Sequence, residues 1–208
     1  MSHTAIPKGK IEIPAYKVEK EAALTAEKTA LLIVDMQNDF VRPEGSLYVP
    51  SAAVTVEPIR TLLNAARAAG VLRIFTADTH LPNDKETALW PEHCVKGTWG
   101  WQIIDELQPQ EDELVLQKPR YDAFYGTPLD HYLCRVWQIK TLIVVGTVSN
   151  ICVLHTLASA DYRWLKTVVP ADGISALNDF GQAMTLYQAE SLYHSLIVES
   201  CAGIAFVD

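Results

Sequence analysis

Reactive side chains in this sequence stand at the ends of short apolar runs. Asp35 and Lys118 each follow such a run, and Cys152 follows the run Leu142–Val145 after a glycine and a polar turn. A cysteine thiolate is a strong nucleophile, and a carboxylate can take the thiol proton and later give it to a leaving amine. A lysine cation favours both charged forms. The three residue types together predict amide hydrolysis, with no histidine needed as the base.

Cys152 falls at the start of a predicted helix. Gly146 breaks the preceding apolar run, and Thr147, Ser149 and Asn150 offer turn and helix-cap side chains. Free N–H groups at a helix start stabilise a thiolate and can hold an oxyanion. Taken alone, Cys152 is better interpreted as a small core residue, as most free cysteines are. The acid and the lysine at the ends of other predicted strands instead favour the interpretation of Cys152 as a nucleophile.

Predicted strands alternate with predicted helices along the whole chain. The strands are expected at Ala30–Val34, Val71–Ala77, Leu114–Leu116, Leu142–Val145, Thr167–Val169 and Leu196–Val198, and the helices at Val56–Ala66, Trp101–Leu107, Leu129–Trp137, Ile151–Ala158 and Phe180–Leu192. This alternation predicts a three-layer α/β/α fold with a parallel sheet of about six strands. Functional residues of such sheets collect at the carboxyl ends of the strands, so the reactive side chains are expected to share one crevice.

The length of 208 residues and the 49% hydrophobic content predict a single domain. We place it at residues 29–208. Residues 1–28 mix proline, lysine and glutamate without periodicity, and we interpret them as an extended N-terminal arm or a lid over a neighbour. Apolar side chains between Ile11 and Leu24 make self-association, as a dimer or tetramer, an expectation.

Charge and cysteine usage narrow the class of protein further. The net charge of −8 and the pI near 5.2 argue against a nucleic-acid partner or an anionic membrane surface. No segment approaches the roughly 18 apolar residues of a membrane span, and the polar first residues do not resemble a secretory signal. The four cysteines are widely spaced without a CxxC pair, which favours reduced thiols over a disulfide framework. We therefore expect a cytoplasmic protein.

Three segments resemble the signatures of the isochorismatase-like cysteine hydrolases, in which nicotinamidases are the best-known members. They are DMQNDF at residues 35–40, QKPRYDAF around Lys118 and VGTVSNICV around Cys152, and the resemblance covers roughly residues 29–200. It implies an Asp35, Lys118 and Cys152 triad with a thioester on the cysteine. It also implies a cis peptide between Thr147 and Val148, and an oxyanion hole formed by the N–H groups of Val148 and Cys152.

The resemblance to nicotinamidases implies a metal site in the segments DTH and WPEHC. Asp78 and His80 are two residues apart, so on an extended chain both point the same way, and His93 adds a third ligand. Glu86 corresponds to a fourth ligand that varies among nicotinamidases. A divalent zinc, iron or manganese ion is the implied cofactor, with no organic cofactor. The alternative is a loop of ordinary polar residues.

Aromatic residues near these segments are candidates for substrate binding. By the resemblance, Phe40 and Trp90 sandwich the flat ring of the substrate, and Tyr121 and Tyr125 line the same pocket. Each is equally suited to a place in the core or a lid.

The implied function is hydrolysis of a small carboxamide, with nicotinamide converted to nicotinate and ammonia as the first hypothesis. The acidic loop at residues 80–93 lacks the extra histidine of many nicotinamidases, and the N-terminal arm is long. Two alternatives therefore stay open. One is an amidase for a carbamoyl, ureido or other small aliphatic amide, and the other is a catalytically silent binding or scaffold module.

Overall fold

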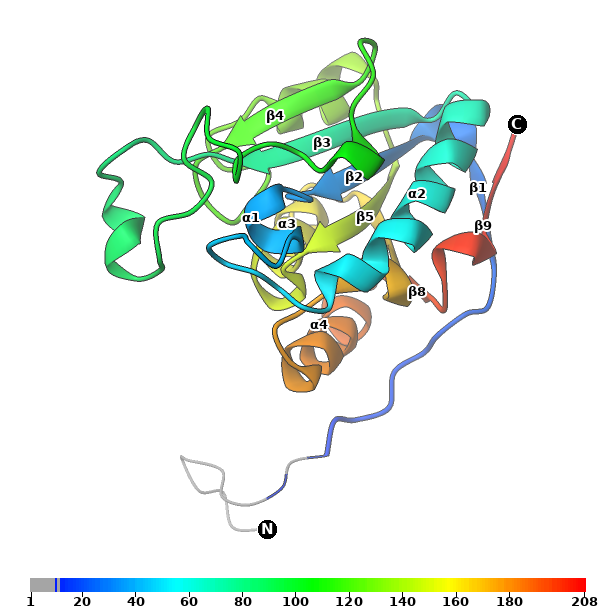
Figure 1. Ribbon diagram of the computed structural model, residues 1–208. Helices are drawn as coiled ribbons and strands as arrows, with labels where there is room; N and C mark the ends of the chain where they lie inside the picture. The colour runs from blue at the N-terminus through cyan, green and yellow to red at the C-terminus, as the bar shows by residue number, and fades with distance from the viewer. Residues whose placement is uncertain (1–9, 11) are drawn as a thin grey trace.

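The computed structural model describes residue 10 and residues 12–208, and the rest of the predicted arm lies outside the described residues. Its centre is a parallel sheet with the strand order β4-β3-β2-β5-β6-β8, which confirms the predicted α/β fold (Figure 1). A short strand, β7, pairs with the end of β5. The strands are β2 (Thr29–Val34), β3 (Leu72–Asp78), β4 (Leu114–Lys118), β5 (Thr141–Thr147), β6 (Lys166–Pro170), β7 (Ile174–Ser175) and β8 (Leu196–Val198).

The two middle strands of the sheet are β2 and β5. β2 is buried at every position, and β5 at every position after its first residue, as expected for strands covered on both faces. β2 lies between β3 and β5, with Val34 in register with Thr76 on one side and Gly146 on the other. The carboxyl ends of all three strands therefore lie side by side.

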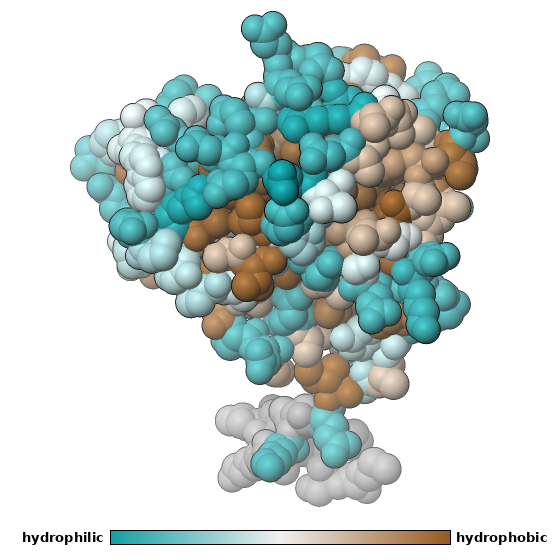
Figure 2. All heavy atoms as spheres, turned by 45° about the vertical axis from the view of Figure 1, so that its right-hand side comes forward, coloured by the Kyte–Doolittle hydropathy of each residue, from teal (hydrophilic) through white to brown (hydrophobic). Residues whose placement is uncertain are grey.

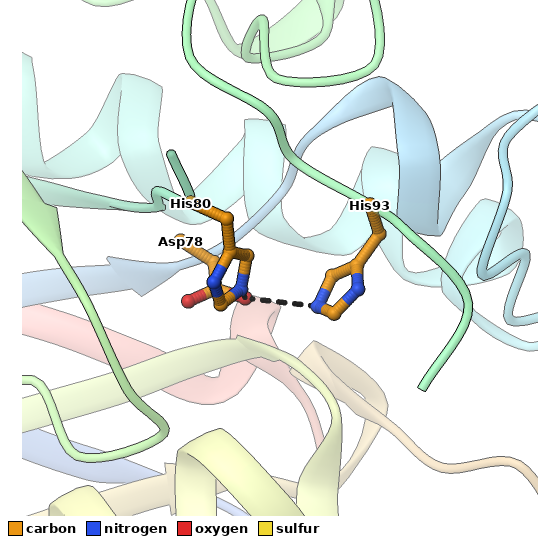
Figure 3. Close-up of side chains that lie close together, drawn as sticks. All are labelled: Asp78, His80 and His93. Atoms are coloured by element: carbon orange, nitrogen blue, oxygen red, sulfur yellow. Dashed lines mark hydrogen bonds and ion pairs between the residues drawn. The ribbon is translucent and has the colours of Figure 1, made fainter. Parts of the chain in front are cut away.

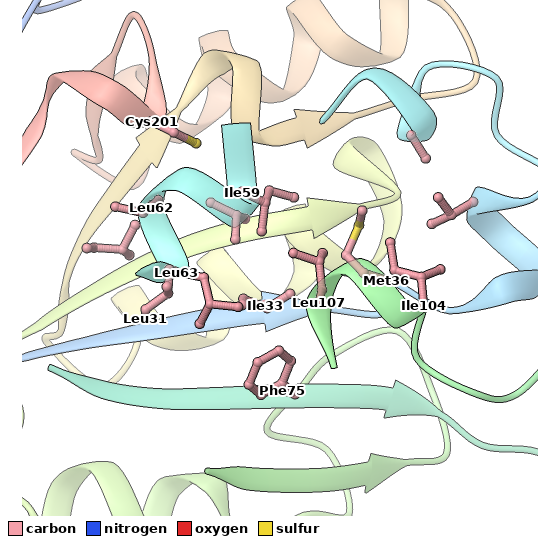
Figure 4. Close-up of a cluster of buried hydrophobic side chains, with 14 of the residues drawn as sticks. Leu31, Ile33, Met36, Ile59, Leu62, Leu63, Phe75, Ile104, Leu107 and Cys201 are labelled. Atoms are coloured by element: carbon pink, nitrogen blue, oxygen red, sulfur yellow. The ribbon is translucent and has the colours of Figure 1, made fainter. Parts of the chain in front are cut away.

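Helices cover both faces of the sheet. The long helix α2 (Ala52–Ala68) and the short α1 (Asn38–Val41) lie over one face, whereas α3 (Leu154–Asp161) and α4 (Asp179–Ser191) lie over the other. Figure 4 shows Ile59, Leu62 and Leu63 of α2 beside Ile33 of β2 and Phe75 of β3. Along β2, Leu31 and Ile33 face this core whereas Ala30, Leu32 and Val34 face the opposite one, so the strand contributes to two hydrophobic layers.

Short helical turns connect the main elements. They are η1 (Ala26–Lys28), η2 (Lys85–Ala88), η3 (Asp105–Leu107), η4 (His131–Val136), η5 (Ser149–Val153), η6 (Ala171–Gly173) and η7 (Cys201–Gly203), of which η4 and η5 are π-helical.

The helix predicted at Trp101–Leu107 is wrong, because only the single turn η3 forms there. The backbone of this segment instead bonds to the chain after β2. The N–H of Asn38 donates to Gln102, and the N–H of Ile104 donates to Met36. These bonds fix the segment against the end of β2, close to Asp35.

Part of the predicted arm joins the body of the protein. β1 (Ala22–Thr25) pairs in parallel with β9 (Ile204–Val207), and Glu19 bonds through its backbone to Ile197 and Glu199 beside β8. The surface in Figure 2 is mostly hydrophilic, with smaller hydrophobic areas between the polar side chains. Within the described residues, no helix is both long and apolar enough to cross a membrane.

Candidate active site

Asp35, Lys118 and Cys152 lie close together at the carboxyl-end edge of the sheet. The ammonium nitrogen of Lys118 lies 2.7 Å from Oδ2 of Asp35 and 3.6 Å from the sulfur of Cys152. Asp35 and Lys118 have no exposed surface, and Cys152 is 4% exposed. Lys118 therefore touches both the predicted acid and the predicted nucleophile, away from bulk water.

The turn after β2 aims Asp35 at this lysine. Asp35 has a φ of 51°, in the left-handed region that aspartate tolerates better than most residues. The Thr76 hydroxyl donates to Oδ1 of Asp35 at 2.7 Å. No hydrogen bond of good geometry from a described residue reaches Oδ2, although Lys118 lies beside it. Thr76 thus holds one carboxylate oxygen of Asp35, and the Lys118 ammonium lies beside the other.

The turn after β5 presents Cys152. The peptide between Thr147 and Val148 is cis, as predicted. The helical segment then opens with the π-helical turn η5, in which the N–H groups of Ile151 and Val153 both donate to the carbonyl of Val148. Cys152 thus stands in the first turn of the helical segment that continues into α3.

Gly146 explains how β5 can come so close to β2. Its φ is 117°, and a Cβ atom at this position would overlap the carbonyl oxygen of Val34. Only glycine combines this backbone conformation with such a close approach. The nucleophile's strand and the acid's strand are thereby held at a fixed separation.

The pKa shifts of Cys152, Asp35 and Lys118 do not favour a thiolate at Cys152 before substrate binds. Burial raises the pKa of Cys152 well above its ordinary value, and the nearby Lys118 cation opposes this effect only in part. Burial likewise raises the pKa of Asp35 against the influence of Lys118. Burial would lower the pKa of Lys118, but the negative charges around it raise that pKa well above its usual range. These effects favour the thiol form of Cys152, for which the nearby Asp35 is the candidate base.

Asp78, His80 and His93 form a second, adjacent cluster (Figure 3). The Nε2 atoms of His80 and His93 lie 3.1 and 3.4 Å from Oδ2 of Asp78. Asp78 raises the pKa of His80 to about 9. Asp78 also reaches Lys118, at 3.3 Å, so the two clusters share a boundary. One carboxylate and two imidazole nitrogens converging on one point are a donor set suited to zinc or iron.

The other nitrogens of both histidines are held by the protein. The Nδ1–H of His93 donates to the carbonyl of Pro91 at 2.7 Å, and the Nδ1–H of His80 donates to Asp84 at 3.2 Å. This leaves Nε2 of each ring to face Asp78. Glu86 groups with His80 and Asp84, and neither of its buried carboxylate oxygens has a hydrogen-bond partner among the described residues.

Three residues that support these clusters escaped the sequence reasoning. Gln37 is buried and bonds through its side chain to both the N–H (2.8 Å) and the carbonyl (2.9 Å) of Asp78. Asp84 holds His80, and Arg120 holds Asp84. Gln37 lies inside the DMQNDF segment, which was the one available signal, whereas nothing local marks Asp84 or Arg120.

A small pocket, partly open to solvent, leads to Cys152. Phe40, Trp90 and Tyr121, the predicted substrate-binding residues, line it, and the Trp90 indole N–H donates to the Tyr121 hydroxyl at 2.8 Å. Tyr125 is 61% exposed and does not line it. The remaining walls come from Leu47, Val49, Asp78, His93, Val148, Ile151 and Leu177.

Comparison with known proteins agrees with this geometry. The family model for the isochorismatase domain matches residues 29–197, so the chain belongs to the isochorismatase family of cysteine hydrolases and amidases. The nicotinamidase/pyrazinamidase from Bacillus subtilis is similar to it in structure, with a TM-score of 0.79 and 29% identity over 83% of this chain and 100% of that chain.

Two other solved structures widen the comparison within the family. The N-carbamoylsarcosine amidase from Thermoplasma acidophilum has a TM-score of 0.75 and 35% identity over 82% of this chain and 95% of that chain. A cysteine hydrolase from Pseudomonas syringae pv. phaseolicola has a TM-score of 0.80 and 29% identity over 89% and 94% of the two chains. The family and its hydrolytic class are thus established, and the substrate is a separate question.

Proposed function

We propose that this protein hydrolyses a small, flat, uncharged carboxamide, with nicotinamide as the first candidate, to the carboxylic acid and ammonia. The observation that carries the proposal is the contact of Lys118 with both Asp35 and Cys152 at the base of an aromatic cavity. A silent binding module has no need to bury a lysine between an acid and a thiol, since burying charges is costly.

In the proposed reaction, Oδ2 of Asp35 takes the thiol proton of Cys152 while the sulfur attacks the amide carbon. The carbonyl electron pair moves to the oxygen, which the N–H groups of Val148 and Cys152 stabilise. Asp35 then gives its proton to the amide nitrogen, the carbon–nitrogen bond breaks and ammonia leaves. A water molecule, deprotonated by Asp35, attacks the resulting thioester, and the sulfur recovers the proton as the acid is released.

Lys118 has two roles in this scheme. It is placed to stabilise the thiolate that forms during attack, and it opposes the effect of burial on the pKa of Asp35.

The cluster of Asp78, His80 and His93 fits a divalent metal ion, and zinc, iron or manganese is the proposed cofactor. The fit rests on the converging donors of the three residues, and we propose as a fourth ligand the buried Glu86, whose carboxylate oxygens accept no hydrogen bond from the described residues and whose one ion-pair partner among them is Arg120, at 3.5 Å. A metal ion bound there would supply a Lewis acid that orients a ring nitrogen of the substrate. We propose no organic cofactor.

The lining of the cavity supports a neutral aromatic substrate. Phe40, Trp90 and Tyr121 offer ring faces, and no Lys or Arg of the described part of the chain lines the cavity. The 35% identity to an N-carbamoylsarcosine amidase favours a second candidate, an N-carbamoyl compound. Such a substrate carries a carboxylate, for which a cationic partner in the cavity is the expected feature.

The decisive experiment measures ammonia release from nicotinamide and from N-carbamoylsarcosine, with metal content determined on the same purified sample. Cys152→Ala is expected to abolish release, and Cys134→Ala, at a partly buried free cysteine outside the cavity, serves as the matched control. Activity retained by Cys152→Ala would exclude the proposed nucleophile. Turnover of the carbamoyl compound alone would replace the first candidate with the second.

The assembly and location remain parts of the same proposal. We propose a homo-oligomer, a dimer or tetramer, with no nucleic-acid or membrane partner, in the cytoplasm. The four free cysteines are consistent with a reducing compartment. Residues 1–28 are proposed as an arm appended to the hydrolase domain at residues 29–208.

A further inference from the structure

Asp84 occupies a central position beside the proposed metal site without being one of its predicted ligands. Its Oδ2 accepts the Nδ1–H of His80 at 3.2 Å, and its Oδ1 accepts the N–H of Glu86 at 3.0 Å. One carboxylate therefore contacts two of the four proposed metal ligands. Its side chain is 14% exposed, so these bonds are largely shielded from water.

Arg120 fixes Asp84 from the other side of the loop. Its Nη1 donates to Oδ2 of Asp84 and its Nη2 donates to Oδ1, both at 3.1 Å. Two parallel bonds between a guanidinium and a carboxylate define the orientation of both groups. The same guanidinium lies 3.5 Å from Oε2 of Glu86.

Arg120 is also tied to the catalytic group. Its backbone carbonyl accepts a hydrogen bond from the Lys118 ammonium at 3.0 Å. The residue thus links the end of β4, where Lys118 lies, to the loop after β3 that carries the proposed ligands.

We propose that Asp84, held by Arg120, is a positioning residue that sets the orientation of His80 and Glu86 toward the metal ion. The inference rests on the metal site of the proposed function. A histidine ligand that donates its second N–H to a carboxylate has a fixed ring orientation and a more basic ligating nitrogen. Loss of such a partner typically lowers metal affinity about 10- to 100-fold.

The alternative role for Asp84 is purely local, because it also caps the short turn η2 (Lys85–Ala88). Asp84→Ser separates the two roles. Serine is a good cap for the N–H of Glu86, but its short side chain cannot reach His80. Asp84→Asn keeps an acceptor of the original length, and its affinity is expected to lie between those of the parent and Asp84→Ser.

The experiment is a zinc titration of the full chain, first stripped of metal, against a competing chelator. We expect Asp84→Ser to weaken zinc binding about 10- to 100-fold. Arg120→Gln is expected to weaken it less, since Asp84 then stays in place but is free to rotate. Asp112→Ser is the matched control, because Asp112 is an exposed acid paired with Arg73. Thermal unfolding of each metal-free variant checks that it is folded.

Zinc affinity of Asp84→Ser within threefold of the parent would overturn the inference, as would an equal loss in Asp112→Ser. If Asp84→Ser does not fold, Asp84→Asn and Arg120→Gln decide the matter by the same comparison. A parent chain that binds no zinc, iron or manganese would remove the metal site from the proposed function, and this inference with it. Equal affinity of parent and variant removes the inference alone.

Discussion

The Lys118 ammonium lies 2.7 Å from the Asp35 carboxylate, and both side chains are completely buried. An ion pair so placed is costly to desolvate, and it is retained here beside a thiol. Replacement of Lys118 with Met removes the cation that lowers the pKa of Cys152. We expect alkylation of Cys152 to slow about tenfold or more, since each unit by which the pKa rises reduces the thiolate fraction tenfold.

The measurement is the rate of modification of Cys152 followed by peptide mass spectrometry across pH. Lys166→Met, at an exposed lysine on β6, is the control. Lys118→Met also leaves Asp35 unpaired, which is expected to destabilise the fold by about 3–5 kcal/mol, and a second change, Asp35→Asn, should recover part of this loss. An unchanged alkylation rate in folded Lys118→Met would contradict the assigned role.

Gln37 is predicted to matter through the backbone of Asp78. Gln37→Ala removes two side-chain bonds to Asp78 and a third to the carbonyl of Trp101. At about 1 kcal/mol for each bond, we expect a loss of about 2–4 kcal/mol in the free energy of unfolding and weaker metal binding. Urea unfolding measures the first effect.

Gln37→Glu refines this test, because glutamate can accept from the Asp78 N–H but cannot donate to the two carbonyls. We expect it to be destabilised nearly as much as Gln37→Ala. Gln102→Ala, at an exposed glutamine nearby, should leave stability within about 0.5 kcal/mol of the parent. Full stability in both Gln37 variants would show that these bonds contribute little.

Tyr121 and Trp90 are predicted to act on substrate binding rather than on chemistry. Tyr121→Phe removes the acceptor for the Trp90 indole N–H. The loss of about 1 kcal/mol from this wall of the cavity corresponds to a rise in KM of about fivefold, with kcat little changed. Steady-state kinetics with Tyr125→Phe as the matched control, at an exposed tyrosine, test this. A fall in kcat at constant KM would place Tyr121 in the chemical step instead.

Glu113 predicts a pH dependence of stability far from the site. Burial alone would raise its pKa, but hydrogen bonds from Arg67, the N–H of Gln110 and Arg73 lower it from 4.5 to about 2. A carboxyl group whose pKa is lower in the folded than in the unfolded state stabilises the fold at pH values above its unfolded pKa. That stabilisation is lost as the pH falls through the folded pKa. The contribution should therefore be complete above about pH 5 and disappear between pH 4.5 and pH 2.

Glu113→Gln is expected to cost about 1–3 kcal/mol at pH 7 and progressively less below pH 4.5. Urea unfolding at several pH values gives the comparison. Glu111→Gln, two residues earlier and exposed, should show no such convergence. A difference between parent and Glu113→Gln that stays constant with pH would contradict the linkage.

The juxtaposition of Asp35, Lys118 and Cys152 could be predicted from sequence because the carboxyl ends of parallel strands lie at one edge of the sheet. Asp35, Lys118 and Cys152 each mark the end of an apolar run, and strand register then brings them together. The spacing of Asp78 and His80 likewise follows from an extended backbone. These inferences use only local pattern and the topology of the sheet.

The remaining features depend on contacts that no local pattern encodes. The apolar spacing at Trp101–Leu107 suits a helix, but the backbone bonds there go to Met36 and Asn38. Tyr121 and Tyr125 both follow Lys118 closely, and nothing in the sequence distinguishes them, yet Tyr121 lines the cavity and Tyr125 is exposed. Asp84 and Arg120 are 36 positions apart, so no local pattern predicts the ion pair between them.

The close approach of Gly146 to Val34 belongs to the sheet, and the residues placed by the sheet differ from those placed by the loop after β3. Asp35 and Cys152 follow the paired strands β2 and β5 and Lys118 ends β4, whereas Trp90 and His93 come from the loop between β3 and β4. We therefore expect substitutions in that loop to alter the pocket wall more than the placement of Asp35, Lys118 and Cys152. A side chain at Gly146, by contrast, would push β5 away from β2 and so displace the turn that carries Cys152 from Asp35.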